Sequence, residues 1–180
     1  MKVEVVISGD RNRRQLGESI AEAYTGYLIV DRVWLMYERN PAIAFNKGAR
    51  FSQNSLILFC GGDCFIDEGN MARLVEALLM SKKKIAYANP GNWKENYIPS
   101  GFVSGMFVAF RDFVLDHPFI EWPDFCEEIP YRVLYAAEIT VANQIPWEHR
   151  HDSCTIHRSN HRIRQLCKIL WTIKRNLRLA

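Results

Sequence analysis

Apolar residues recur at two spacings along the chain, which predict strands and helices in turn. The alternating segment "KVEVVIS", the apolar run at 56–59 and the segments "KIAYA", "FVSGMFVAF" and "ITVAN" are typical of buried strands. One helical stripe stands out between them, formed by Met71, Leu74, Val75, Leu78 and Leu79. Strands that alternate with helices predict a single α/β domain, with a mostly parallel sheet and helices on both faces.

The remaining elements follow from weaker signals. Asp10 is a reasonable N-cap for a helix that runs to Tyr24, and Asp67 for the helix that carries the stripe. The next strand begins within 27–40, at either "YLIV" or "VWLMY". Short helices are expected at "AIAFNKGARFS" and "RDFVLDH", and another helix at "CEEIPYRVLYAAE". Residues 1–157 form the main body, and 158–180 form a basic amphipathic helix of the same domain.

Composition and charge narrow the class of protein. The 180 residues are 48% hydrophobic and 24% charged, which suits one globular domain. No apolar run approaches the length of a membrane-spanning helix, and the N-terminus is unlike a secretory signal, so a cytoplasmic protein is expected. Five cysteines without framework spacing predict reduced thiols. The net charge of +3 includes seven Lys or Arg at 158–178, so the rest is acidic and nucleic-acid binding is not expected.

A single carboxylate follows the strongest predicted strand. That strand ends at Gly61 and Gly62, and Asp63 comes next. Ligands of open α/β sheets lie at the carboxyl ends of the strands, and glycines let a ligand approach the backbone closely. A carboxylate there suits a divalent cation that holds phosphate oxygens. The alternative is that Asp63 and Asp67 only form a turn and cap the next helix.

The segment "NPAIAFNKGARFSQNSLILFCGGDCFID" resembles the core of the GT-A glycosyltransferases, especially the minimal family 2 type. Asn46 and Gly48 fall in register with the family pattern, whose following strand ends in D-x-D. Downstream, "SGMFVAFRDFVLDHPFIEWPDFCEEIPYR" looks like the acceptor-side strand, a short helix and an acidic E-D pair. The resemblance covers most of 40–145. It departs from the family where Gly61 replaces the first Asp of D-x-D, and where the acidic pair is Glu127-Glu128.

This resemblance implies an enzyme that moves a sugar from a nucleotide-sugar donor to an acceptor hydroxyl, with inversion in the family 2 manner. Mn²⁺ or Mg²⁺ would be held by Asp63, with His151 or His149 completing the site. Glu128, or its neighbour Glu127, would act as the general base. The implied donor-binding residues are Ser8, Asp10, Asp31, Asn46, Gly61 and Gly62. The implied acceptor-side residues are Gly105, Trp93 and Trp122, and the acceptor is a glycan, lipid or protein.

Simpler interpretations stand beside these. Asp10 can be only a helix cap, Asp31 an ordinary turn residue, and Glu127 and Glu128 solvated acids at a helix start. A zinc site at His151, Cys154, His157 and His161 has no supporting spacing pattern.

Two other function classes also remain open. One is a non-catalytic GT-A-like protein that binds a nucleotide-sugar or a partner. The other is a nucleotidyltransferase, for which "SGDRNRR" gives a faint version of the required basic loop. The helix at 158–180 can contact an anionic membrane peripherally, pack on the sheet, or mediate a dimer.

Overall fold

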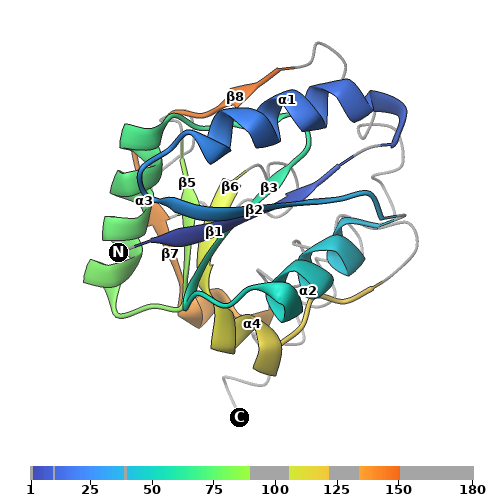
Figure 1. Cartoon of the computed structure of the whole chain (residues 1–180). Coiled ribbons are helices and arrows are strands. Elements are labelled where there is room, and N and C mark those ends of the chain that lie inside the picture. The colour runs from blue at the N-terminus through green and yellow to red at the C-terminus, as the bar shows by residue number, and fades with distance from the viewer. Residues whose placement is uncertain (1, 10, 39, 90–105, 122–133, 151–180) are drawn as a thin grey trace, which may run out of the picture.

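The computed structural model describes residues 2–9, 11–38, 40–89, 106–121 and 134–150, which form a sheet covered by helices on both faces (Figure 1). Within these residues the sheet has six strands, in the order β2-β1-β3-β6-β5-β7. Their bounds are β1 Val3–Ser8, β2 Val30–Met36, β3 Leu56–Gly61, β5 Ile85–Ala88, β6 Met106–Phe110 and β7 Ile139–Ala142. A small separate ladder pairs β4, Cys64–Phe65, with β8, Glu148–His149.

Strand direction confirms the predicted α/β class, in a sheet that is mixed because one strand is reversed. β1 runs parallel to both β2 and β3, and β5 runs parallel to β7. β6 is antiparallel to both of its neighbours, β3 and β5. Three of the five pairings are therefore parallel, and the carboxyl ends of β1, β2 and β3 meet at one edge of the sheet.

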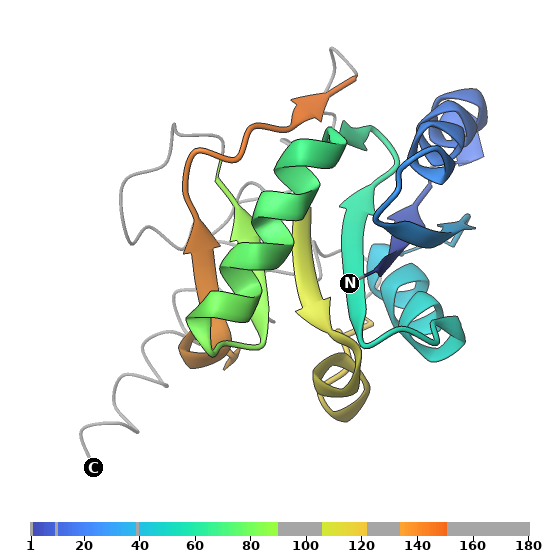
Figure 2. The same ribbon diagram turned by 60° about the vertical axis from the view of Figure 1, so that its left-hand side comes forward.

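Helices bury one side each against the two faces of the sheet. Their bounds are α1 Arg14–Thr25, α2 Pro41–Phe51, α3 Glu68–Ser81 and α4 Arg111–Asp116, with 3-10 turns η1 Arg11–Arg13 and η2 Ala136–Glu138. α1 and α3 lie on one face and α2 and α4 on the other (Figure 1). Figure 2 shows α3 lying across the half of the sheet that holds β5, β6 and β7.

Alternation along the strands builds two separate cores. Val5 and Ile7 face α1 and α3, where they pack in one cluster with Ile20 and Tyr24. Val6, between them, points to the other face and packs with Phe45 of α2. The period of two in "KVEVVIS" therefore serves both faces of the sheet.

Of the two predicted helix caps, the structure confirms the one at Asp67, and it adds a third cap at Asn40. Asp67 caps α3, because its side chain accepts a hydrogen bond from Asn70 N at 2.9 Å. Asn40 caps α2 in the same way through Ala42 N, with Pro41 as the first helical residue. α1 begins only at Arg14, after the 3-10 turn, and its N-cap is Arg13 without a side-chain capping bond. The prediction of Asp10 as the N-cap of this helix is therefore wrong.

No helix in the described part of the chain has both the length and the apolar character needed to cross a membrane.

The predicted stripe on α3 is largely correct: Met71, Leu74, Val75 and Leu78 are buried. Leu79 is the exception, with 41% of its surface exposed.

Candidate functional site

The backbone joins three strand ends into one edge. Ser8, the last residue of β1, pairs with Met36 on one side and with Gly61 on the other. Beyond the paired residues, Gly9 N donates to Met36 O at 2.8 Å, and Gly62 N donates to Ser8 O at 2.8 Å. This edge carries the predicted donor-site residues Ser8, Gly61 and Gly62, and it is where an open α/β sheet binds its ligands.

Asp63 lies directly beyond this edge and faces an arginine. Its Oδ2 is 3.6 Å from Nη1 of Arg13, and about a quarter of each side chain is exposed, 25% for Arg13 and 27% for Asp63. The Cys64 thiol donates to Asp63 Oδ1 at 3.4 Å. The carboxylate predicted from the sequence is thus accessible from solvent and held in an ion pair.

A late segment of the chain also reaches Asp63. Arg150 N donates to Asp63 O at 2.8 Å, next to the ladder that pairs Cys64 with His149. The guanidinium of Arg150 stacks on Phe65, with Cζ 3.6 Å from the ring centroid. The hydrogen bond from Arg150 N to Asp63 O therefore places the beginning of the histidine-rich segment beside Asp63. His151, the predicted second metal ligand, lies outside the described residues.

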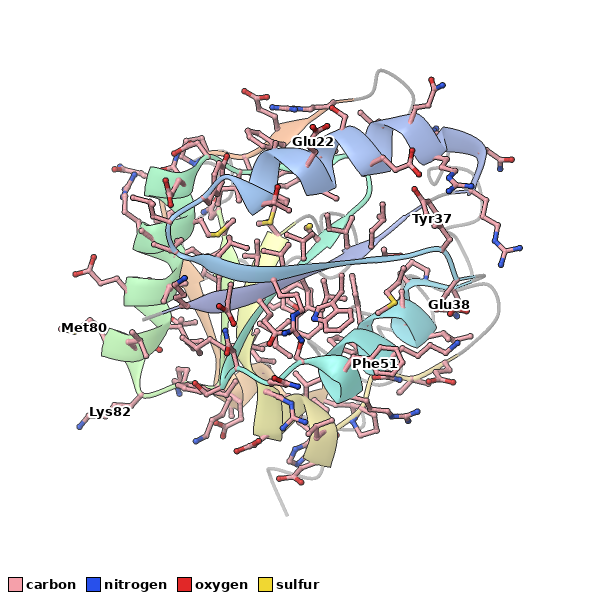
Figure 3. All side chains as sticks on the ribbon, in the orientation of Figure 1. Glu22, Tyr37, Glu38, Phe51, Met80 and Lys82 are labelled. Carbon is pink, nitrogen blue, oxygen red and sulfur yellow. The ribbon has the colours of Figure 1, made fainter. Side chains whose placement is uncertain are left out.

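The turn after β1 holds three arginines in place, and we call residues 11–14 the arginine turn. Arg11 donates through Nε and Nη2 to Tyr37 O, each at 3.3 Å, and Tyr37 OH donates to Arg14 O at 3.1 Å. Figure 3 shows Tyr37 between the end of β2 and the start of α1. Tyr37 also closes over Gly9, where an added Cβ would lie 2.7 Å from the Tyr37 ring carbon Cε1. A glycine is needed there to let the turn and Tyr37 pack together.

Sequence reasoning missed the arginine turn as part of the site. The signal was present, because three arginines occur within four residues directly after the first strand. What the sequence does not show is that the turn folds back beside Asp63, some fifty residues away along the chain.

Asp31 lies at the opposite edge of the sheet from the site. β2 begins at Val30, opposite Val3, so Asp31 starts the strand instead of following it. Its carboxylate is 3.9 Å from Lys2 Nζ and accepts from Asn54 Nδ2 at 3.4 Å. The prediction that a strand over "YLIV" ends before Asp31 is therefore wrong, because β2 begins only at Val30, and the structure does not bring Asp31 to the site. Tyr37 and Glu38 follow the site end of β2 instead, and Glu38 pairs with Lys47 at 2.7 Å.

Asn46 is buried in α2 and its amide is used within the protein. Its Nδ2 donates to Phe119 O at 2.9 Å and to Glu121 Oε1 at 2.8 Å, and its Oδ1 accepts from Phe119 N at 2.9 Å. Only 4% of the residue is exposed. These contacts make Asn46 an anchor for the segment 119–121, and its predicted contact with the donor stays a prediction.

Several predicted residues lie outside the described part of the chain. They are Asp10, Trp93, Gly105, Trp122, Glu127, Glu128 and His151, together with Cys154, His157 and His161 of the zinc alternative and the helix at 158–180. Their assignments stay predictions.

The described residues supply one carboxylate for a divalent cation at this edge, that of Asp63, and no second ligand. Gly61 contributes no ligand, and Asp63 is already paired with Arg13. Gly61 also leaves room for that pair, since an added Cβ would lie 3.1 Å from Asp63 Oδ1 and 3.3 Å from Cys64 Sγ. Across the described residues, no group of three or more His, Cys, Asp or Glu is placed to hold a metal ion. We therefore route no chemical step through a metal.

Comparison with known proteins identifies the fold. No protein-family model matches the sequence, and no curated protein matches it. Residues 1–349 of TarS from S. aureus, solved with UDP-GlcNAc, match with a TM-score of 0.65 and 10% identity, over 94% of this chain and 66% of that chain. Glucosyl-3-phosphoglycerate synthase from Mycobacterium tuberculosis, solved with Mn²⁺, UDP-glucose and phosphoglyceric acid, matches with a TM-score of 0.64 and 13% identity, over 94% and 78%.

The same synthase, solved with Mg²⁺ and UDP, matches with a TM-score of 0.60 and 14% identity, over 86% of this chain and 73% of that chain. The chain therefore has the GT-A fold that the sequence predicts, and it spans about two thirds of the TarS chain. Likeness at such low identity shows the fold, and the activity is argued from the site.

Proposed function

We propose that the protein is a glycosyltransferase that moves a sugar from a nucleotide-sugar donor to an acceptor hydroxyl. The observation that carries this proposal is the Asp63–Arg13 pair, 3.6 Å apart, at the edge where β1, β2 and β3 of a GT-A sheet end. A diphosphate needs positive charge close to its oxygens, and the guanidinium of Arg13 lies at this edge. The matched structures with UDP-GlcNAc and UDP-glucose support a nucleotide-sugar as the ligand class.

The proposed reaction is a single displacement at the anomeric carbon. The acceptor oxygen forms a bond to that carbon while the bond to the diphosphate oxygen breaks, so the configuration inverts. The acceptor proton passes to a carboxylate, for which the sequence predicts Glu128. The leaving nucleoside diphosphate keeps the electron pair, and positive charge at this edge of the sheet stabilises it.

A thermal-shift panel tests the proposal. The full chain is measured with UDP-, GDP-, CMP- and dTDP-sugars, each with and without Mn²⁺, against the free sugars as controls. A ligand at about 100 times its dissociation constant stabilises the fold by about 2.7 kcal/mol, which is a shift of several degrees. We expect one nucleotide-sugar to raise the melting temperature and to release its nucleoside diphosphate slowly. If none of them shifts the melting temperature under either condition, the proposal is wrong.

The products of the same incubation separate the alternatives. A non-catalytic binding protein, the alternative motivated by Gly61 and by Glu127-Glu128, would be stabilised but would release no nucleoside diphosphate. A nucleotidyltransferase would release pyrophosphate in a separate incubation with a nucleoside triphosphate and a sugar phosphate. The arginine turn supports this alternative, because a nucleotidyltransferase needs a basic loop after its first strand.

The remaining parts of the proposal concern metal, acceptor and location. Mn²⁺ or Mg²⁺ at Asp63 and His151 is a prediction of the sequence resemblance, and the metal arm of the panel tests it. The acceptor side is proposed at Trp93, Gly105 and Trp122, and a lipid-linked acceptor is proposed to be met at a membrane surface through 158–180. Co-sedimentation with anionic vesicles, with and without 158–180, tests the last point, and equal partition of the two forms would contradict it.

A further inference from the structure

The charge of the site differs from that of the D-x-D pattern that it resembles. Two aspartates would give this edge two negative charges. Here Gly61 removes one of them, and Arg13 adds one positive charge 3.6 Å from the remaining carboxylate. Asp63 and Arg13 together are neutral. Two carboxylates attract a divalent cation, whereas a neutral pair with an accessible guanidinium is better suited to an anion.

We propose that Arg13 binds the diphosphate of the donor directly, and that the nucleotide binds to this protein without a divalent cation. The inference rests on the proposed function, because it assigns the diphosphate subsite of the same site. Asp63 then acts as a positioning residue that holds the guanidinium of Arg13 at the strand ends. Arginine is suited to this task, since its planar group presents several N–H donors and can meet two phosphate oxygens at once.

The three arginines of the turn face different partners, which singles out Arg13. Arg14 pairs with Glu18 on the outer side of α1, with Nε 2.7 Å from Oε1, and its side chain is 72% exposed. Arg11 donates to the backbone oxygen of Tyr37. Arg13 is the member of the turn that is paired with the carboxylate of Asp63.

The surrounding packing fixes the position of the Arg13 backbone. Gly9 is bonded to Met36 O and covered by Tyr37, and the hydroxyl of Tyr37 is bonded to Arg14 O. These contacts tie both ends of the turn to the end of β2. A cation supplied by the protein at a fixed place costs less ordering on binding than one that is recruited from solution.

Calorimetric titration tests the proposal with UDP, GDP, CDP and dTDP, each in EDTA and again with Mn²⁺. The proteins are the wild type, Arg13→Gln, Asp63→Asn and the matched control Arg14→Gln, which removes the same charge one residue away. We expect the wild type to bind one of these nucleotides in EDTA. Arg13→Gln should weaken this binding at least about tenfold, in keeping with the loss of a charge-assisted hydrogen bond, and Arg14→Gln should change it less than about threefold.

The direction in which Asp63→Asn changes nucleotide affinity distinguishes a positioning role of Asp63 from a role as metal ligand. Asparagine keeps a side-chain oxygen that can accept from Arg13 but removes the negative charge that would repel a diphosphate, so if Asp63 only positions Arg13, nucleotide binding in EDTA should be unchanged or tighter. If Asp63 is a metal ligand on which binding depends, the wild type should bind only with Mn²⁺ and Asp63→Asn should lose that binding. The second result, or unchanged affinity of Arg13→Gln, overturns this inference and leaves the proposed function standing.

A result without nucleotide binding in any buffer has a different meaning, because it contradicts the proposed function itself.

Arg13→Lys serves as the folding control, since it keeps the charge but not the planar fork. We expect it to melt like the wild type and to recover part of the lost affinity.

Discussion

Trp34 donates its indole N–H to the carboxylate of Glu4, with 2.5 Å between Nε1 and Oε2, and thereby stabilises a charge inside the sheet. Glu4 is 0% exposed. Its other oxygen accepts from Gln53 N at 2.8 Å and from Asn54 N at 3.1 Å, just after α2 ends. A buried carboxylate is tolerated when such donors replace water. Through these hydrogen bonds Glu4, in β1, links β2 to the segment that leads into β3.

The first prediction concerns acid stability. Burial raises the pKa of Glu4, but the hydrogen bonds from Trp34, Gln53 and Asn54 outweigh it and hold the pKa below its usual 4.5. A carboxyl whose pKa is lower in the folded state stabilises the fold above its unfolded pKa. That contribution is lost as the pH falls through the folded value. We therefore expect Glu4→Gln to lower the free energy of unfolding near neutral pH and to flatten its dependence on pH below about 4.5.

Urea unfolding at neutral pH and at several values below pH 4.5 measures this effect. Asp112→Asn is the control, because that carboxylate is 90% exposed and should change neither the stability nor its pH dependence appreciably. An acid limb as steep in Glu4→Gln as in the wild type would contradict the assignment to Glu4.

The second prediction concerns the contact of α2 with β1. A Cβ added at Gly48 would lie 2.3 Å from Val6 Cγ1 and 2.6 Å from Val6 Cγ2, so the helix packs on the strand at a distance that only glycine permits. Gly48→Ala should therefore destabilise the protein by about 1–3 kcal/mol, the usual effect of overpacking. The midpoint of urea unfolding gives this value directly.

A rescue experiment and a matched control make this prediction specific. Val6→Ala removes the two methyl groups in question, so Gly48→Ala should cost less in that background than in the wild type. Gly26→Ala is the control, because its Cβ would meet nothing closer than Ala23 O at 3.6 Å. Strict additivity of Gly48→Ala and Val6→Ala would show that the clash is not the cause.

The sequence predicts the parts of the site that rest on local patterns. Asp63 follows the run at 56–59 directly, and Asp67 caps α3, because strand ends and caps depend on neighbours in the chain. The position of β2 was ambiguous, since "YLIV" and "VWLMY" are both apolar and overlap the strand that forms. The register of Ser8 with Met36 decides between them, and this register comes from the whole sheet. Asp31 was misplaced for that reason.

Contacts between distant segments account for what the sequence patterns did not predict. Asn46 matches the family pattern, yet its partners Phe119 and Glu121 lie more than seventy residues away, where spacing gives no guide. Arg13 was visible as a basic residue after β1, but its contact with Asp63 depends on how the turn folds back. Residue types predicted the chemistry of this edge, and tertiary packing decided which side chains meet there.

The third prediction separates two roles of Asn46. If its amide anchors the segment 119–121, Asn46→Ala should lower the stability by about 1–3 kcal/mol, because buried partners lose their hydrogen bonds. The affinity for a nucleoside diphosphate should stay within about threefold of the wild type, since the charged groups of the diphosphate subsite are untouched. Calorimetric titration and thermal unfolding of one sample measure both quantities. A large loss of affinity at unchanged stability would instead restore Asn46 as a donor ligand.

The last prediction concerns the proposed general base. In the helix that the sequence predicts at this segment, adjacent residues would point about 100° apart, so only one of Glu127 and Glu128 would face the acceptor. Glu128→Gln should reduce the release of nucleoside diphosphate about 10²–10⁴-fold, the usual contribution of a general base. Its affinity for the donor should not change, because the base acts on the acceptor proton. Glu127→Gln, the neighbouring change of the same kind, should stay within a few-fold of the wild type. Equal losses in the two variants, or a loss of donor affinity in Glu128→Gln, would show that this pair serves the structure and not proton transfer.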